Sequence, residues 1–383
     1  MRRSRSFLLI AVIALFATLA AAAAHYTPGA ALVINAAGVH GWPERYAKAT
    51  SRAYDTSPLT VPWRGGTLNA RLYLPQGRID RAVVLAPGVH AGGIDEPRLV
   101  NFAGDLAARG FAMLTVDLPD LKNYEVTPRT ADMIEDAGLW LSAQRRYTLD
   151  GRIGLIGISF GGGLTVVAAG RPSLRDKVAF ALSFGGHADF PRTLKFLCTG
   201  TQADGQYRRP HDYGVVLILL GVADRVVPPN QVEILRNGIR VFLEASHVAM
   251  VDKPRSEQIF QQAIEMAKTM PEPAATMMRY VNDRNVKVLG PILLPFVAAH
   301  GGDPALSPDR APAPTAPVYL LHGTDDTVIP AVESEYLAKD LERRGTHVHL
   351  LVTPLITHAE MDRPMDFLEL WRMIAFWTAV LHD

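Results

Sequence analysis

Thiols are almost absent from this sequence: among 383 residues there is one cysteine, Cys198. A single thiol cannot form an intrachain disulfide, and it cannot supply the several thiolates of a structural zinc site. Cys198 also lies too far along the chain to be a lipid-anchored N-terminal residue. We therefore expect it to be a small buried side chain.

An excess of charge of either sign is also missing, because 39 lysines and arginines face 38 aspartates and glutamates. Arg2, Arg3 and Arg5 stand in an N-terminal segment without acidic residues, and the rest of the chain has 36 basic and 38 acidic residues. This faintly acidic balance argues against nucleic acid as a partner. Hydrophobic residues at 48% and charged residues at 20% exclude a disordered chain and a multi-span membrane protein.

Motifs for cofactors and metals are missing as well. The sequence has neither a glycine-rich phosphate loop nor a dinucleotide fingerprint. His347 and His349 lie two positions apart on an expected strand and therefore face the same side, but no third metal ligand accompanies them. We therefore expect no cofactor and no metal.

Only one apolar run reaches the length of a membrane span, residues 7–24, and it follows three arginines and precedes a polar segment. This is the layout of a secretory signal, and small residues at Ala22 and Ala24 favour cleavage before His25. The alternative is that the same run stays as a single membrane anchor. We expect an exported protein, periplasmic or secreted, that contacts the membrane only if the segment is not cleaved.

Beyond this segment the chain alternates between two kinds of pattern. Residues 25–56 have few periodic signals and are expected to be an irregular or partly helical lead-in. Short β-branched runs alternate with helical spacing over residues 57–190 and again over 316–383, which predicts a mostly parallel sheet with helices on both faces. Residues 191–315 have helical spacing and end in a proline-rich connector. We therefore predict a doubly wound α/β catalytic domain with a helical cap inserted in it.

The segment Gly157-Ile158-Ser159-Phe160-Gly161 follows an expected strand and opens an expected helix. A nucleophile at such a turn needs a strained backbone at the serine and glycines two residues to either side, where side chains would collide. The helix N-terminus also favours negative charge on a substrate. The alternative is an ordinary glycine-rich turn with no chemistry.

A serine hydroxyl needs a base to take its proton and an acid to orient that base. In this architecture the acid and then the histidine follow the serine, each after a later strand. Asp325 and Asp326 follow one expected strand and His358 follows the next, so the order is as required. Asp224, in GVADRVVPP, is a rival acid if the preceding GVVLILL is a strand, but no histidine-bearing turn follows it promptly.

These motifs, GISFGG, HGTDDTVIP and THAEM, resemble those of α/β-hydrolases in the dienelactone-hydrolase-like and prolyl-oligopeptidase-like group. The resemblance covers about residues 57–190 and 316–383. It implies the α/β-hydrolase fold and a triad of Ser159, His358 and Asp326, with Asp325 as a turn residue whose role could be exchanged with that of Asp326. Dienelactone hydrolases have a cysteine where this chain has Ser159, which favours simple ester hydrolysis here.

An oxyanion hole needs two backbone N–H donors. The residue after the serine, Phe160, would supply one, and the resemblance implies Val89 for the other, with His90 as the runner-up. His90 and His187 both follow expected strands, so either could line the substrate pocket, or be solvated, while His322 is expected to stabilise the acid loop.

Together these residues predict an exported serine esterase that forms an acyl-enzyme with a small-molecule ester. A peptidase or an acyltransferase would reuse the same triad with other substrates or acceptors, and a non-catalytic binding protein could keep the fold. The sequence does not define the substrate or the oligomeric state.

Overall fold

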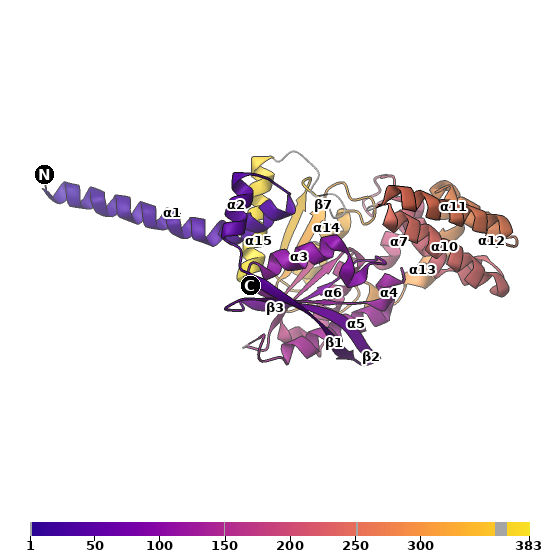
Figure 1. Ribbon diagram of the computed structural model, residues 1–383, viewed down its shortest axis with the longest axis horizontal. Coiled ribbons are helices and arrows are strands. Elements are labelled where there is room, and N and C mark those ends of the chain that lie inside the picture. The colour runs from indigo at the N-terminus through magenta and orange to yellow at the C-terminus, as the bar shows by residue number, and fades with distance from the viewer. Residues whose placement is uncertain (1, 149, 250–251, 357–365) are drawn as a thin grey trace.

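A computed structural model describes residues 2–148, 150–249, 252–356 and 366–383; for residues 2–16 and 19 it describes the backbone alone. Among these residues one eight-stranded sheet has the strand order β1-β2-β4-β3-β5-β6-β7-β8 (Figure 1). The strands are β1 (Tyr54–Trp63), β2 (Gly66–Pro75), β3 (Arg81–Ala86), β4 (Phe111–Val116), β5 (Ile153–Ile158), β6 (Val178–Phe184), β7 (Val318–Gly323) and β8 (Val348–Thr353).

The sheet is parallel except at one side. Strands β1 and β2 form the expected antiparallel hairpin, β2 pairs antiparallel with β4, and the strands from β4 to β8 run parallel. The central strands are buried on both faces, which explains their continuous apolar runs: Val83, Val84 and Leu85 of β3 are each at most 1% exposed. This architecture confirms the predicted mostly parallel α/β sheet.

Helices cover both faces of the sheet. Helices α5 (Pro128–Ser142), α6 (Phe160–Gly170) and α14 (Val332–Arg343) share one hydrophobic core with one face. Helices α1 (Arg2–Ala36), α3 (Pro97–Ala107) and α15 (Phe367–His382) contribute to a second core on the other face. The sheet is therefore doubly wound, as predicted.

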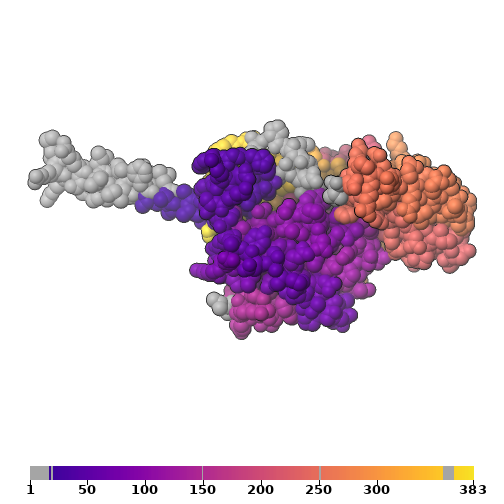
Figure 2. Space-filling model, in the orientation of Figure 1, coloured from indigo at the N-terminus to yellow at the C-terminus, as the bar shows by residue number. Residues whose placement is uncertain are grey.

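Between β6 and β7 the chain leaves the sheet and forms a helical lobe, which lies to one side of the sheet (Figures 1 and 2). Its core continues into the core of the sheet and contains Met270, Met277 and Met278. Gly238 leaves room for two of these methionines, because a Cβ there would lie 2.6 Å from Met270 Cε and 3.0 Å from Met278 Sδ. The main helices of the lobe are α7 (Phe190–Thr199), α8 (Asp212–Gly221), α9 (Ala223–Val226), α10 (Val232–Val248), α11 (Lys253–Thr269), α12 (Ala274–Asn282) and α13 (Val286–Gly301).

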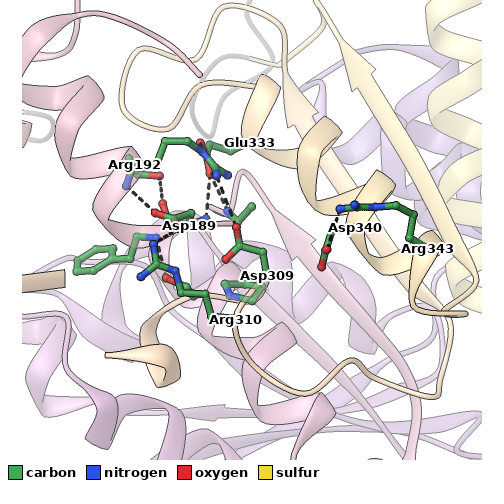
Figure 3. Close-up of polar contacts among 12 residues, drawn as sticks. Asp189, Arg192, Asp309, Arg310, Glu333, Asp340 and Arg343 are labelled. Atoms are coloured by element: carbon green, nitrogen blue, oxygen red, sulfur yellow. Dashed lines mark hydrogen bonds and ion pairs between the residues drawn. The ribbon is translucent and has the colours of Figure 1, made fainter. Parts of the chain in front are cut away.

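A cluster of ion pairs joins both ends of this lobe to the sheet domain (Figure 3). Glu333 of α14 is buried; its Oε2 accepts the backbone N–H of Asp189 at 3.1 Å, and its Oε1 pairs with Arg192 Nε at 2.6 Å. Arg192 also lies 3.5 Å from Asp309, and Arg310 pairs with Asp189. Residues 189–192 enter the lobe and residues 309–310 leave it, so one buried carboxylate and its neighbours hold both connections.

The N-terminal helix α1 continues through the predicted cleavage site, and its C-terminal part packs on α15 (Figure 1). Leu32 and Val33 are buried there, and a Cβ on Gly29 would lie 2.7 Å from the carbonyl oxygen of Ile374. Residues 25–36 of the expected lead-in are therefore helical and form part of the second core. Within the described residues, no helix combines the length and the hydropathy that a membrane span requires.

Candidate active site

Ser159 occupies a strained turn between β5 and α6. Its φ of 55° and ψ of −131° lie in a region that residues with a side chain rarely adopt. The flanking glycines make the turn possible, since a Cβ on Gly157 would collide with the carbonyl oxygen of Gly161, and one on Gly161 with that of Pro87. The Gly-x-Ser-x-Gly pattern thus forms a strand, a sharp turn and a helix, the geometry of a nucleophile elbow.

The loop after β3 lies directly against this serine. A Cβ on Gly88 would be 3.2 Å from Cβ of Ser159, a contact tighter than most, so glycine eases this close approach. Val89, the next residue, is partly buried. Phe160 is the first residue of α6, and its N–H is one of the first four of the helix, which have no partner within it. The structure therefore brings the two loops that carry the predicted oxyanion donors together at Ser159.

Asp326 lies in the turn after β7 and is buried, with 1% of its surface exposed. Its Oδ1 accepts the backbone N–H groups of Val328 at 2.8 Å and Ile329 at 3.0 Å. His322 Nε2 lies 2.8 Å from the carbonyl oxygen of Ile329 and 3.5 Å from Asp326 Oδ2, and its Nδ1 lies 2.7 Å from Ser334 Oγ. The carboxylate is thus fixed by its own turn, and His322 is fully engaged in supporting that turn.

The two rival acids lie in different surroundings. The side chain of Asp325 is 42% exposed and pairs with Arg208 at 3.2 Å. Asp224 belongs to the short helix α9, is half exposed and pairs with Arg225 at 3.3 Å. The apolar run before Asp224 forms helix α8, so this aspartate does not follow a strand of the sheet.

The predicted base, His358, lies outside the described residues, as does all of 357–365. The chain enters this segment at the carboxyl end of β8. This end lies on the same side of the sheet as the turns of Ser159 and Asp326, because Thr353 at the end of β8 pairs with Gly323 at the end of β7. Strand β7 is two strands from β5, which is about 10 Å at the usual strand spacing.

His187, expected in the pocket wall, is completely buried. Its Nε2 lies 2.7 Å from the carbonyl oxygen of Leu306, and its ring centroid is 5.5 Å from that of Phe160 and 5.4 Å from that of Phe190. Burial lowers the pKa of His187, so the ring is neutral. His187 therefore packs against two phenylalanines and has no surface exposed to solvent.

His90 lies in the loop beside Ser159 and contacts the helical lobe. Its Nδ1 accepts the N–H of Gly92 at 3.1 Å, and its Nε2 lies 2.8 Å from Nδ1 of His247 in α10. Burial, and to a smaller extent the neighbouring His247, lower the pKa of His90 to about 4. This histidine therefore connects the predicted oxyanion loop to the lobe.

A cavity of about 180 Å³ lies between Phe160, the first residue of α6, and helices of the lobe; Ser159 itself is not among its lining residues. The predicted pocket histidines His90 and His187 are not among its lining residues; Phe160, Phe190 and Tyr124 are. Tyr124 was not predicted from the sequence. Its φ of 64° lies in a region that glycine adopts readily, and no motif marks a tyrosine at this position. The residues that line the cavity are Tyr124, Glu125, Val126, Thr127, Phe160, Phe190, Leu194, Leu197, Leu217, Ile218, Gly221, Arg236 and His300.

No group of three or more His, Cys, Asp or Glu side chains within the described residues is arranged to hold a metal ion. Cys198 is buried, and burial raises the pKa of its thiol to about 12, so this thiol is not a nucleophile at neutral pH.

A sheet of this strand order, with a serine at a strained turn after β5 and a buried aspartate after β7, defines the α/β-hydrolase fold. No protein-family model matches the sequence, and no curated protein does.

Several solved structures are similar to this chain. One is a hyperthermophilic esterase from the archaeon Pyrobaculum calidifontis, with 17% identity over 87% of each chain and a TM-score of 0.45. Another is brefeldin A esterase, a bacterial homologue of human hormone-sensitive lipase, with 15% identity over 93% of this chain and 83% of that one and a TM-score of 0.48. A third is a dienelactone hydrolase from Anabaena variabilis, with 17% identity over 85% of this chain and 96% of that one and a TM-score of 0.43.

Proposed function

We propose that the protein is an exported serine hydrolase that cleaves carboxylic esters through Ser159, His358 and Asp326. The observation that carries this proposal is the strained backbone of Ser159. Its φ is 55°, and Gly157 and Gly161 flank it in the turn. Strain of this kind persists where the surrounding structure enforces it, and it clusters at catalytic residues. The buried, hydrogen-bonded Asp326 on the same edge of the sheet supports the same chemistry.

In the proposed reaction Ser159 Oγ attacks the ester carbonyl carbon while His358 takes the hydroxyl proton. Asp326 orients His358, and the N–H groups of Val89 and Phe160 stabilise the negative charge on the carbonyl oxygen. The carbon–oxygen bond to the alcohol then breaks, and His358 returns its proton to the leaving alcohol. Water attacks the acyl-enzyme with the same assistance, which releases the acid and restores Ser159.

Comparison of matched serine variants tests this proposal. Purified protein should hydrolyse p-nitrophenyl acetate or butyrate, and Ser159→Ala should abolish turnover, whereas the exposed serine variant Ser57→Ala should retain it. A peptide or acyl-transfer assay on the same preparations separates the esterase from a peptidase or an acyltransferase. Absence of turnover with every acyl donor would favour the non-catalytic binding protein.

The proposed export rests on the N-terminal sequence and needs its own experiment. Cell fractionation with N-terminal sequencing should find the protein outside the cytoplasm, starting near His25 if the segment is cleaved. A cytoplasmic protein that starts at Met1 would contradict the proposed export without affecting the ester chemistry.

A further inference from the structure

The loop after β3 carries both candidates for the second oxyanion donor, Val89 and His90. Among the described residues, neither of these two N–H groups has a hydrogen-bond acceptor. The carbonyl oxygen of His90 accepts the N–H of Gly93 at 3.0 Å, so this main-chain bond ties the loop only beyond the donors. A donor in an oxyanion hole must be free, and it must be held in place before the substrate binds. Side-chain contacts are therefore needed to hold these two N–H groups in place.

The side chain of His90 is bound at both ring nitrogens. Its Nδ1 accepts the N–H of Gly92 at 3.1 Å, so the ring proton is on Nε2. Nε2 lies 2.8 Å from Nδ1 of His247 and donates to it, and the two rings meet edge to face with centroids 4.2 Å apart. The ring lies so close to Gly92 that a Cβ there would be 3.0 Å from Nδ1. His90 is therefore held between its own loop and the helical lobe.

His247, the acceptor in this bond, stands at the end of helix α10 in the lobe. It is the last residue but one of this helix and is partly buried. Earlier in α10, Leu235, Ile239 and Phe242 are buried in the core to which the lobe contributes. The position of Nδ1 of His247 is therefore set by the packing of the lobe.

The neighbours of His90 in its own domain do not replace His247. Glu96 accepts the N–H of Leu99 at 2.7 Å at the start of α3 and pairs with Arg98 at 2.7 Å. Both nitrogens of the His90 ring are occupied by the partners already named. Loss of the His247 acceptor would leave the Nε2–H of a partly buried ring without its partner, which is costly enough to let the loop shift.

We infer that His247 is a positioning residue: through His90 it holds the oxyanion donor of the β3 loop against Ser159, so that the lobe completes the oxyanion hole. This inference rests on the proposed ester hydrolysis. Negative charge on the carbonyl oxygen develops in the transition state, so a displaced donor lowers kcat and leaves substrate binding nearly unchanged. A contact that only stabilised the fold would not have this selective effect.

Variants of His247 test the inference through separate measurement of kcat and KM. His247→Leu removes the acceptor and should lower kcat for p-nitrophenyl butyrate about 10- to 100-fold with KM within about twofold, since removal of a whole donor costs about 100- to 1,000-fold. His247→Ala removes the same acceptor with a smaller side chain and should give the same loss. His247→Asn should restore kcat to within about threefold of wild type, because its amide oxygen, like Nδ1, is an acceptor one bond beyond Cγ.

Ser246→Ala on the same helix is the control for these variants. The hydroxyl of Ser246 bonds to the carbonyl oxygen of Phe242 at 3.1 Å, within α10, so its loss should leave kcat and KM as in wild type. A rise in KM with unchanged kcat in His247→Leu, or a failure of asparagine to restore kcat, would overturn the inference.

Hydrogen exchange separates this inference from the proposed activity. Mass spectrometry of a peptide that spans residues 90–96 should show exchange about tenfold faster in His247→Leu than in wild type, the effect of losing one hydrogen bond, and wild-type exchange in His247→Asn. If wild type cleaves no ester but exchange follows this pattern, the proposed function is wrong and His247 still holds the loop. Unchanged exchange in His247→Leu and His247→Ala overturns the inference, whether or not esters are cleaved.

Discussion

The imidazoles of His90 and His247 lie edge to face, with His90 Nε2 and His247 Nδ1 2.8 Å apart. Because His90 Nδ1 accepts the N–H of Gly92, its proton is on Nε2 and is donated to His247. The bond therefore needs a proton on His90 Nε2 and a free lone pair on His247 Nδ1. It joins the loop beside Ser159 to helix α10 of the lobe.

This pair predicts a loss of stability in acid. The pKa of His90 is about 4 in the folded protein, against about 6.5 when unfolded, so the unfolded chain takes up the proton first. The contribution of His90 is complete above pH 6.5 and is lost as the pH falls toward 4. Glu96 and Arg98 also face His90, with opposite effects on its pKa.

Urea unfolding of wild type and His90→Leu between pH 7.5 and 4 measures this contribution. Burial also lowers the pKa of His187 and His300, so the difference between the two proteins is the quantity of interest. The stability of the variant should fall less steeply below pH 6.5, and the exposed-residue variant His40→Leu should follow wild type. Parallel curves for wild type and His90→Leu would contradict the assignment.

Substitution of single aspartates by asparagine should identify the acid of the triad. Asp326→Asn should lower kcat by about 10,000-fold, as expected when the carboxylate that orients the histidine is lost. Asp325→Asn and Asp224→Asn should stay within about threefold of wild type, because both side chains are exposed and ion-paired. An equal loss in Asp325→Asn would mean that the roles of the two neighbours are exchanged.

Glu333 should be essential for the attachment of the lobe. Glu333→Ala leaves Arg192 and two backbone N–H groups without their buried partner, and breaking a buried ion pair costs about 3–5 kcal/mol. The free energy of unfolding from urea titration measures this loss. An exposed glutamate, Glu257→Ala, serves as the control, and a change below about 1 kcal/mol in Glu333→Ala would refute this role.

Asp309 in the same cluster should behave in the opposite way. Burial and the neighbouring Asp189 raise the pKa of Asp309 to about 6, and its Oδ1 is buried without a partner. Its ionised form is therefore unfavourable at pH 7.5, and stability is gained as the pH falls from about 6 toward the unfolded value near 3.8. Asp309→Asn should increase stability at pH 7.5, by on the order of 1 kcal/mol, and lose this advantage near pH 4. The exposed variant Asp176→Asn should show no such effect.

The second part of α1 should be needed for folding, and the first should not. A protein of residues 25–383 should unfold at nearly the same urea concentration as the full chain, because Leu32 and Val33 remain on α15. Leu32→Ala within it should cost about 2–5 kcal/mol, whereas the partly exposed Leu350→Ala should cost much less. If removal of residues 1–24 alone unfolds the protein, this account of α1 is wrong.

The sheet and the turn of Ser159 could be predicted because each has a local signature. Continuous β-branched runs indicate buried parallel strands, and the glycines around Ser159 indicate a turn where a side chain would collide. The run GVVLILL was ambiguous, since an apolar segment of this length fits a strand or a buried helix, and tertiary packing makes it helix α8.

Other parts of the site have no local signature. The burial of His187 behind Phe160 and Phe190 depends on the lobe, which the alternation of strands and helices does not describe. Tyr124 has a positive φ although it is not a glycine, and no sequence pattern indicates this. The sequence therefore predicts the residues of the turns, and the three-dimensional packing determines which residues form the cavity.

Covalent labelling of Ser159 is the most direct measurement of the central claim. The purified protein should react with a serine-directed fluorophosphonate to one label per chain, and peptide mapping should locate that label on Ser159, with loss of ester hydrolysis in the same proportion. Ser159→Ala should take up no label. Labelling of another serine, or full ester hydrolysis by a protein without a reactive Ser159, would contradict the account.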